Sequence, residues 1–277
     1  MTLRAGARRL GFGLSTLLGL RARGFFIPYR YAAGVAAKPY PALEPLFRAA
    51  EADSFALVDA IDRYGPELRA VRDGPGPARF GQSWFPRLDA AAAYATVRST
   101  RPAQILEIGS GHSTRFLARA VADGGLATEI TAVDPAPRAS LAGLAVRHER
   151  RLFGAADRDR VAALGSGDIL FVDSSHVAMP GTDVDCILGD VLPRLAPGVL
   201  VHWHDIFLPD PYPAGWAWRG YNEQIAVAAL LQGGYELLFA SRWLATRHPG
   251  RLARGILAEL PHPDGAPETS LWLRKLR

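Results

Sequence analysis

Short apolar runs alternate with amphipathic stretches through the C-terminal two thirds of this 277-residue chain. Apolar runs of four to eight residues are typical of strands covered on both faces, and we expect strands at 104–108, 129–134, 168–173, 199–204, 235–240 and 270–276. Helical spacing of apolar residues predicts helices at 89–99, 114–122, 137–145, 183–195 and 221–231. Strands that alternate with helices indicate an α/β fold with a doubly wound, mostly parallel sheet.

The N-terminal third has a different pattern. Apolar positions in residues 41–72 have helical spacing, and the Pro/Gly-rich stretch at 73–77 ends that pattern. We therefore expect an N-terminal helical extension, residues 1–78, ahead of a main domain at residues 79–277. Residues 241–268 are rich in Pro, Gly and Arg, and the sequence predicts no element there.

The first forty residues contain seven Arg or Lys residues and no acid. Removing these seven charges from the formal net charge of +5 leaves −2 for the rest of the chain. A mildly acidic body argues against a nucleic-acid groove in the main domain. The only cysteine, Cys186, has no partner for an internal disulfide, which favours a cytoplasmic protein.

An uncharged apolar segment, residues 10–20, lies among these cations and is too short to span a bilayer. Three interpretations stay open. The segment is an amphipathic helix that packs on the domain or on a second subunit of a homo-oligomer. Alternatively, it is a basic interfacial helix that makes peripheral membrane contact with anionic lipid. The third interpretation is a cleaved or translocated segment.

A glycine-rich turn, Glu107-x-Gly109-x-Gly111, lies between the predicted strand at 104–108 and the next helix. Glycines there allow a tight turn and let a ligand approach the backbone closely. Ser113 or Thr114 is expected to cap the helix. The fingerprint of nicotinamide dinucleotide enzymes needs a third glycine where this chain has Thr114, so that cofactor is disfavoured. A tight turn without any ligand is the other alternative.

Acids and histidines follow the later strands. Asp134 ends the strand after the glycine-rich turn, where an acid can bind both hydroxyls of a ribose. Asp173 ends the strand at 168–173, His176 follows three residues later, and His204 and Asp205 end the next strand. The carboxyl ends of parallel strands meet at one edge of a sheet, so these groups should converge beside the cofactor.

Two carboxylates and an imidazole can hold a divalent cation, either Mg²⁺ or an ion that also accepts nitrogen ligands. His176, on the loop that leaves its strand, is well placed to act as a general base on a hydroxyl. His202 points to the other face from Trp203, and we expect it to be packed rather than catalytic.

These motifs resemble the class I S-adenosylmethionine (SAM)-dependent methyltransferases over roughly residues 80–240. The likeness is to a bacterial group whose metal site resembles that of the macrocin-type and catechol-type metal-dependent O-methyltransferases. The segments that carry it are EIGSGHSTRFLARA, ITAVDP, GDILFVDSSHV and PGVLVHWHDIFLPDPYP. An acid two residues before the first glycine, here Glu107, is part of the pattern.

The resemblance implies a Rossmann-like, seven-stranded sheet, SAM as cofactor and His176 as the base. It implies SAM contacts at Glu107, Gly109, Ser110, Gly111, Ser113, Asp134 and Asp173. It also implies metal ligands at Asp173, His204 and Asp205. One departure matters, because the relatives have an acid where this chain has His204, and the substitution removes a negative charge from the metal site.

The chemistry implied is metal-assisted O-methylation of a small-molecule hydroxyl on a sugar, polyol or phenol. The substrate oxygen binds the metal, His176 removes its proton, and the oxygen attacks the sulfonium methyl group. Residues that follow the last predicted ligand are expected to contact the acceptor, and they include Tyr212, Trp216, Tyr221 and Asn222. Trp84, Phe85 and Arg87 are expected to close the pocket from the N-terminal side.

Two other functions fit the same residues. The domain could bind SAM or a nucleotide without catalysis and dock to a membrane or complex through its basic N-terminus. It could also be a hydrolytic or hydroxylating enzyme in which Asp173, His176, His204 and Asp205 hold iron or zinc and SAM does not bind.

Overall fold

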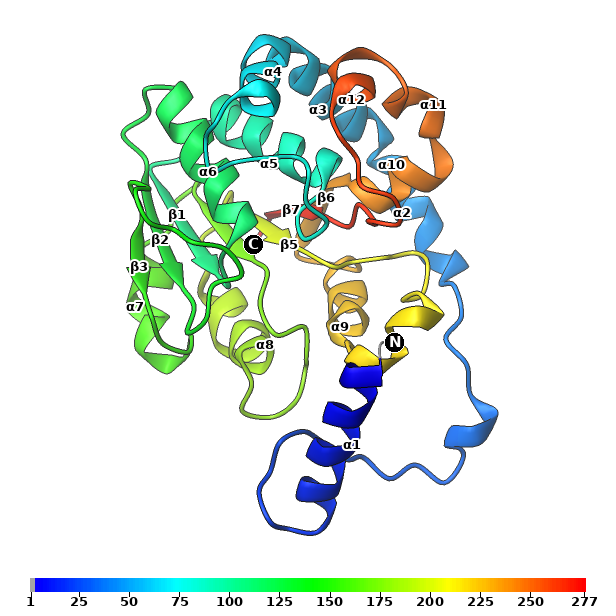
Figure 1. The fold of residues 1–277 in the computed structure, drawn as a ribbon. Helices are drawn as coiled ribbons and strands as arrows, with labels where there is room; N and C mark the ends of the chain where they lie inside the picture. The colour runs from blue at the N-terminus through cyan, green and yellow to red at the C-terminus, as the bar shows by residue number, and fades with distance from the viewer. Residues whose placement is uncertain (1–2) are drawn as a thin grey trace.

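The computed structural model describes residues 3–277, which form a seven-stranded sheet with helices on both faces (Figure 1). The strands are β1 (Gln104–Ile108), β2 (Glu129–Val133), β3 (Arg147–Glu149), β4 (Ile169–Val172), β5 (Leu200–Trp203), β6 (Tyr235–Ala240) and β7 (Leu271–Lys275). Their order is β3-β2-β1-β4-β5-β7-β6, and only β7 runs antiparallel to its neighbours. This arrangement confirms the predicted Rossmann-like, mostly parallel sheet.

The strand order creates a crevice at the centre of the sheet. From β1 the chain proceeds outward to β2 and β3, and it then returns to place β4 on the other side of β1. Ligands bind beyond the carboxyl ends of strands at such a reversal. The central strands are almost completely buried, as their continuous apolar runs predict. The turn after β1 and the residues after β4 therefore flank one crevice.

Helices cover both faces of the sheet. On one side, α5 (Arg87–Thr100) packs against α6 (His112–Asp123) and against α3 (Glu51–Arg63). The helices α8 (Asp183–Cys186) and α9 (Glu223–Leu230) lie on the opposite side (Figure 1). The short helix α7 (Arg158–Ala162) follows β3. The helix predicted at 183–195 begins as α8 and changes to π-helical geometry at Ile187–Val191 and 3-10 geometry at Leu192–Arg194.

The prediction of a helix at 137–145 is wrong. Turns occupy this stretch, and a short edge strand that the sequence did not predict, β3, follows it. Pro137 and Gly143, the latter with a φ of +80°, interrupt the helical pattern. The strand is held by pairing with β2, from Thr131 opposite Arg147 to Val133 opposite Glu149. Such pairing is a tertiary effect that local periodicity does not reveal.

Residues 241–268, for which no element was predicted, form three short helices: α10 (Ser241–Arg247), α11 (Pro249–Leu252) and α12 (Gly255–Glu259). They pack near α2 (Glu44–Ala49), α3 and α4 (Gly65–Asp73), and Arg69 of α4 forms an ion pair with Glu259. The predicted helices of residues 41–72 are thus confirmed. Buried residues of α2–α4 belong to the same hydrophobic core as the strands.

The N-terminal helix α1 (Leu3–Leu17) projects away from the body, and a long connection returns from it to α2 (Figure 1). Within residues 3–277, no helix is long and apolar enough to cross a membrane.

Candidate active site

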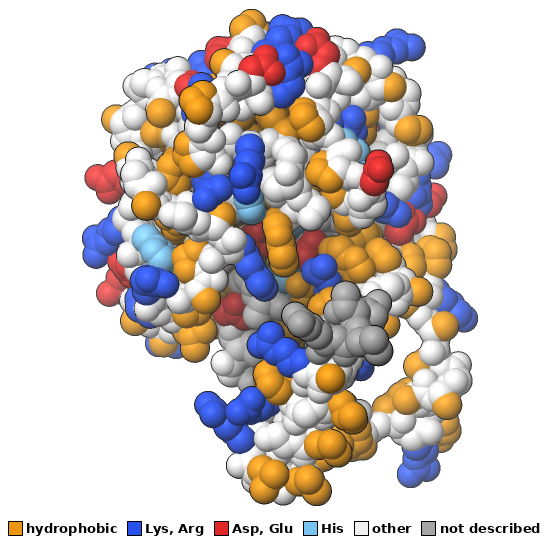
Figure 2. Space-filling model, viewed as in Figure 1, with side chains coloured by type: hydrophobic (Ala, Val, Ile, Leu, Met, Phe, Trp, Pro, Cys, Tyr) orange, Lys and Arg blue, Asp and Glu red, His pale blue; other side chains and the backbone are white. Residues whose placement is uncertain are grey.

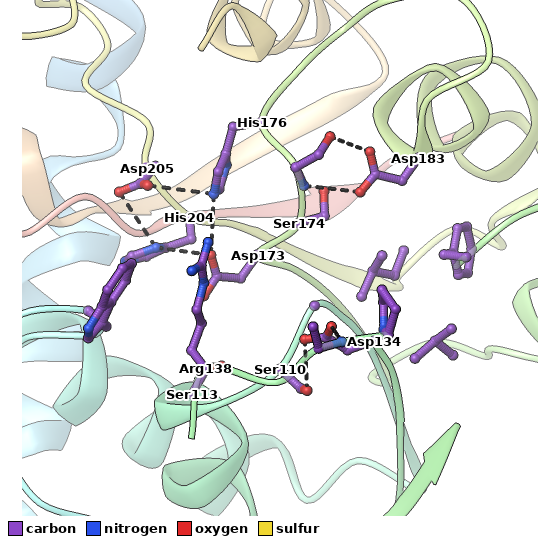
Figure 3. A pocket seen from close by; sticks show the side chains of 18 of the residues that line it. Ser110, Ser113, Asp134, Arg138, Asp173, Ser174, His176, Asp183, His204 and Asp205 are labelled. Carbon is purple, nitrogen blue, oxygen red and sulfur yellow. Dashed lines mark hydrogen bonds and ion pairs between the residues drawn. The ribbon is translucent and has the colours of Figure 1, made fainter. Parts of the chain in front are cut away.

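A cavity of about 360 Å³ opens at the carboxyl ends of the central strands (Figure 3). Its volume is in the range of small-molecule and cofactor sites. The cavity brings together most of the predicted site residues, from the ends of four strands and from the first turn of α6 and the segment before α9: Gly109, Ser110, Ser113, Asp134, Asp173, His176, His204, Asp205 and Tyr221. Trp84 and Phe85 line it as predicted, whereas Arg87 forms an ion pair with Glu268 and does not.

Gly109 brings the turn after β1 against the residue that follows β4. Its φ is +82°, and a Cβ atom at this position would lie 1.8 Å from the carbonyl oxygen of Asp173. Only glycine combines this dihedral angle with such a close backbone approach. The two halves of the crevice are therefore fixed to each other at this point.

Glu107 shapes the turn from behind rather than from inside the cavity. Its carboxylate is completely buried and accepts hydrogen bonds of 2.6 Å from both Ser113 and Thr114. The Thr114 hydroxyl in turn accepts a hydrogen bond of 2.9 Å from the Gly111 amide. Burial raises the pKa of Glu107 to about 8. Neither Glu107 nor Gly111 lines the cavity.

The predicted helix cap is wrong. The helix α6 begins at His112, directly after Gly111, so Ser113 and Thr114 lie inside its first turn. Both hydroxyls donate to Glu107, and Thr114 also takes part in capping from inside the helix, because its hydroxyl accepts from the amide of the N-cap residue Gly111. Burying a carboxylate without partners is costly, and this carboxylate lies within reach of both hydroxyls.

Asp134 lies where a ribose-binding acid is expected, at the end of β2. One carboxylate oxygen accepts a hydrogen bond of 3.0 Å from the Ser110 hydroxyl, and the other accepts one of 2.7 Å from the Ala136 amide. Each oxygen keeps a lone pair for a further donor. The Arg138 guanidinium lies 4.9 Å above the Trp84 ring at the rim of the same cavity.

The other end of the cavity holds a cluster of acids and imidazoles, as the strand ends predict (Figure 3). His176 Nε2 lies 3.5 Å from Asp173 Oδ1 and 3.5 Å from Asp205 Oδ2. His204 Nδ1 lies 3.3 Å from the same Asp173 oxygen and 3.7 Å from Asp205 Oδ1. Each imidazole therefore bridges the two carboxylates.

Two residues of this cluster have left-handed backbone conformations. The φ angles are +60° at His176 and +55° at Asp205. Such angles are uncommon for residues other than glycine and persist where the surroundings hold them, often at functional sites. At His176, the carbonyl oxygen accepts a 3.1 Å hydrogen bond from the backbone amide of Asn222.

Two further acids, neither of them predicted to support a histidine, hold the imidazoles from behind. Glu223, at the start of α9, is completely buried and hydrogen-bonds through Oε1 to His176 Nδ1. Asp89, on α5, lies with Oδ2 3.3 Å from His204 Nε2 and also accepts hydrogen bonds from the Thr269 amide. An acid on the buried face of the Ala-rich α5 is the one signal in the sequence that could have indicated Asp89.

The carboxylates control the charge of both histidines. Burial alone would lower the pKa of His176, but the carboxylates of Glu223, Asp173 and Asp205 outweigh burial and hold the pKa well above its usual value. Burial likewise opposes the charged form of His204, and its neighbours Asp173 and Asp205 raise its pKa. The carboxylates therefore favour the protonated form of both imidazoles.

The predicted divalent cation receives no support from this arrangement. No group of three or more His, Cys, Asp or Glu side chains in residues 3–277 could hold a metal ion. Both nitrogens of His204 already face carboxylates, those of Asp89 and Asp173. Mg²⁺ prefers oxygen ligands, so His204 in place of an acid also weakens a magnesium site.

Of the four residues that were predicted to contact the acceptor, one lines the cavity and three do not. The Tyr221 ring lines the cavity and lies 4.5 Å from the His176 ring. Tyr212 and Trp216 do not line it, and they pack edge-on behind Tyr221. Asn222 is engaged with the backbone, because its side chain accepts a 2.7 Å hydrogen bond from the Ala178 amide.

His202 lies outside the cavity. It is completely buried, stacks on Phe171 at 3.7 Å and contacts the Ser270 hydroxyl at 2.8 Å. This packed position is the one predicted for His202.

One family model and several solved structures are similar to this chain. Residues 106–206 match the family model described as a methyltransferase domain. The fold is similar to that of the SAH-bound methyltransferase PaMTH1 of Podospora anserina, with 18% identity over 92% of this chain and 100% of that chain and a TM-score of 0.42. It is also similar to an O-methyltransferase of Bacillus cereus in complex with SAH, with 14% identity, coverage of 80% and 91%, and a TM-score of 0.39. No curated protein matches the sequence.

The segment of residues 106–206 is thus similar to a methyltransferase domain, as the sequence motifs indicated. The methyltransferase-domain match covers β1, the glycine-rich turn, β4 and β5, which are the parts that build the cavity.

Proposed function

We propose that this enzyme transfers the methyl group of SAM to a hydroxyl of a small molecule, with His176 as the general base. The observation that carries the proposal is the position of His176. Its Nε2 faces the cavity-lining carboxylates of Asp173 and Asp205, while Nδ1 is held by Glu223. This arrangement suits an oriented base: an acid fixes one nitrogen, and the other faces the cavity, where it can take a proton once the ring is neutral.

The proposed reaction is a direct displacement. Neutral His176 accepts the proton of the acceptor hydroxyl at Nε2, and Glu223 stabilises the imidazolium that forms. The acceptor oxygen forms a bond to the methyl carbon while the bond from carbon to sulfur breaks. The products are a methyl ether and S-adenosylhomocysteine, and the proton leaves through His176. The enzyme contributes mainly by aligning oxygen, methyl carbon and sulfur.

The acceptor classes that fit are sugars, polyols and phenols. The acceptor end of the cavity offers the Tyr221 ring for stacking and the carboxylates of Asp173 and Asp205 for neighbouring hydroxyls. The first test is calorimetric titration with SAM, followed by transfer of labelled methyl from SAM to a panel of these acceptors. SAM binding without transfer to any acceptor would instead favour a docking protein.

No step of this mechanism passes through a metal ion. Treatment with EDTA, followed by desalting, should therefore leave kcat within about twofold of the untreated enzyme. The physical reason is that the histidines already neutralise Asp173 and Asp205. Turnover that disappears with EDTA and returns with Mn²⁺ or Mg²⁺ would restore the metal-assisted mechanism implied by Asp173, His204 and Asp205.

The value of kcat/KM should rise toward alkaline pH. The base must be neutral to act, and the raised pKa of His176 keeps it protonated at neutral pH. We expect kcat/KM to increase as the pH rises above 7. In Glu223→Gln, loss of the neighbouring charge lowers the pKa of His176, so the rise should move to lower pH while the maximal rate falls.

A matched control for Glu223→Gln is Glu129→Gln, an exposed acid at the opposite end of the strands. The control should reproduce the wild-type profile in a kcat/KM series from acid to alkaline pH. An unshifted profile in Glu223→Gln would separate that carboxylate from the protonation of His176.

A further inference from the structure

Residues 6–39, here called the basic arm, form a folded unit on the acceptor side of the enzyme. After α1 the chain turns back on the helix: the Ser15 hydroxyl donates to the Arg21 carbonyl oxygen at 2.9 Å, and the Arg23 amide donates to the Thr16 hydroxyl at 2.9 Å. The guanidinium groups of Arg8 and Arg23 lie 5.1 and 5.0 Å from the Phe12 ring.

The basic arm exposes most of the large apolar side chains found on the surface of the described residues. Leu20 is 77% exposed, Phe26 65% and Ile27 64%, and many neighbours resemble them. Figure 2 shows these side chains gathered at the lower end of the molecule. An exposed apolar patch of this kind marks an interaction surface rather than a solvated one.

Cations lie among these apolar side chains. Within the described part of the chain, no ion pair engages the basic residues Arg8, Arg9, Arg21, Arg23, Arg30 and Lys38. The first hydrogen bond that ties this region to the body comes from the Tyr40 amide to the Pro209 carbonyl oxygen, at 2.8 Å. The charges of the basic arm are therefore free to pair with an external anionic surface.

A second cavity, of about 830 Å³, lies between the basic arm and the body. Phe12, Phe26 and Ile27 of the arm line it, together with Met179 and Trp218 of the body. This second cavity borders the active site. Asn222 lines it, and the backbone amide of Asn222 donates a hydrogen bond to the His176 carbonyl oxygen. A partner of the arm would consequently lie beside the acceptor end of the active site.

We propose that the basic arm docks the enzyme on an anionic lipid bilayer. A bilayer surface supplies both features that the arm lacks: phosphates for the arginines and an apolar layer below them for the exposed Leu, Phe and Ile side chains. A second copy of the chain fits less well, since a symmetric contact would oppose two arms of the same uncompensated charge. This inference goes beyond the proposed function and does not depend on the acceptor.

The test is co-sedimentation of the full-length protein with vesicles of phosphatidylcholine alone or of phosphatidylcholine with phosphatidylglycerol. We expect binding to the anionic vesicles, weaker binding at high salt, and little binding to neutral vesicles. The triple variant Arg8→Glu/Arg9→Glu/Arg23→Glu should bind at least a hundredfold more weakly, at about fivefold per arginine.

A second variant, Phe25→Ser/Phe26→Ser/Ile27→Ser, tests the apolar part and should lose binding while it keeps every charge. The matched control is the triple variant Arg63→Glu/Arg150→Glu/Arg254→Glu, which reverses three exposed arginines of the body. Retained SAM binding shows that each variant is folded. The proposal is overturned if wild type does not bind the anionic vesicles, or if the arm variants bind them like wild type. A dimer of the wild type that the serine variant converts to a monomer would then identify a second copy of the chain as the partner.

Discussion

Replacing His176 with alanine should lower kcat by about 10²- to 10⁴-fold, the usual contribution of a general base. The affinity for SAM should stay unchanged, because His176 lies at the acceptor end of the cavity and the glycine-rich turn lies at the other. Single-turnover transfer of labelled methyl measures the rate, and calorimetry measures SAM binding. Near-normal turnover would remove His176 from the mechanism.

Loss of the left-handed backbone at His176 is a competing explanation for a slow variant, because alanine also disfavours a φ of +60°. Free imidazole added to His176→Ala distinguishes the two, since it can replace a missing base but cannot restore a backbone. Partial recovery of turnover with imidazole is expected. The control His262→Ala, which removes a partly exposed imidazole that does not line the cavity, should behave like wild type.

The parts of the site that could be predicted are those that follow from local sequence. Buried strands have continuous apolar runs, and their ends coincide with Asp134, Asp173 and His204. Because parallel strands end at one edge, their terminal residues converge without further information. The edge strand β3 could not be predicted in this way, because it depends on pairing with β2. The turns before it have no regular spacing of apolar residues.

The acids that support the histidines could not be assigned in the same way. Glu223 lies 47 residues from His176 along the chain, and Asp89 lies 115 residues from His204. Contacts over such distances depend on how α5 and α9 pack on the sheet. Neither acid belongs to a motif of fixed spacing, so the sequence identified the imidazoles but not what determines their charge.

Glu107 illustrates a different limit. Its position before the glycines was correctly recognised as part of the turn, yet a pattern does not reveal which way a side chain faces. The carboxylate turns toward the hydroxyls of Ser113 and Thr114, which satisfy it inside the protein. Supporting the turn and contacting a cofactor are two different uses of the same acid, and the contacts of Glu107 within the protein support the turn.

The substitution Gly109→Ala should abolish measurable SAM binding and destabilise the protein by about 3 kcal/mol or more. Two costs combine. An alanine at a φ of +82° is strained by about 1–2 kcal/mol. In addition, its Cβ would lie 1.8 Å from the carbonyl oxygen of Asp173, so the turn and the end of β4 must separate. Urea unfolding and calorimetric titration with SAM measure the two effects.

Gly125→Ala separates these costs. Gly125 also has a positive φ, of +53°, but nothing lies within 4 Å of the position its Cβ would occupy. Backbone strain alone should lower the stability of this variant, by about 1–2 kcal/mol, and it should bind SAM like wild type. The difference between the two variants then isolates the contact of the turn with β4. If both lose the same stability and both bind SAM, the close approach of Gly109 to Asp173 does not form the cofactor site, and the crevice must be held open by other contacts.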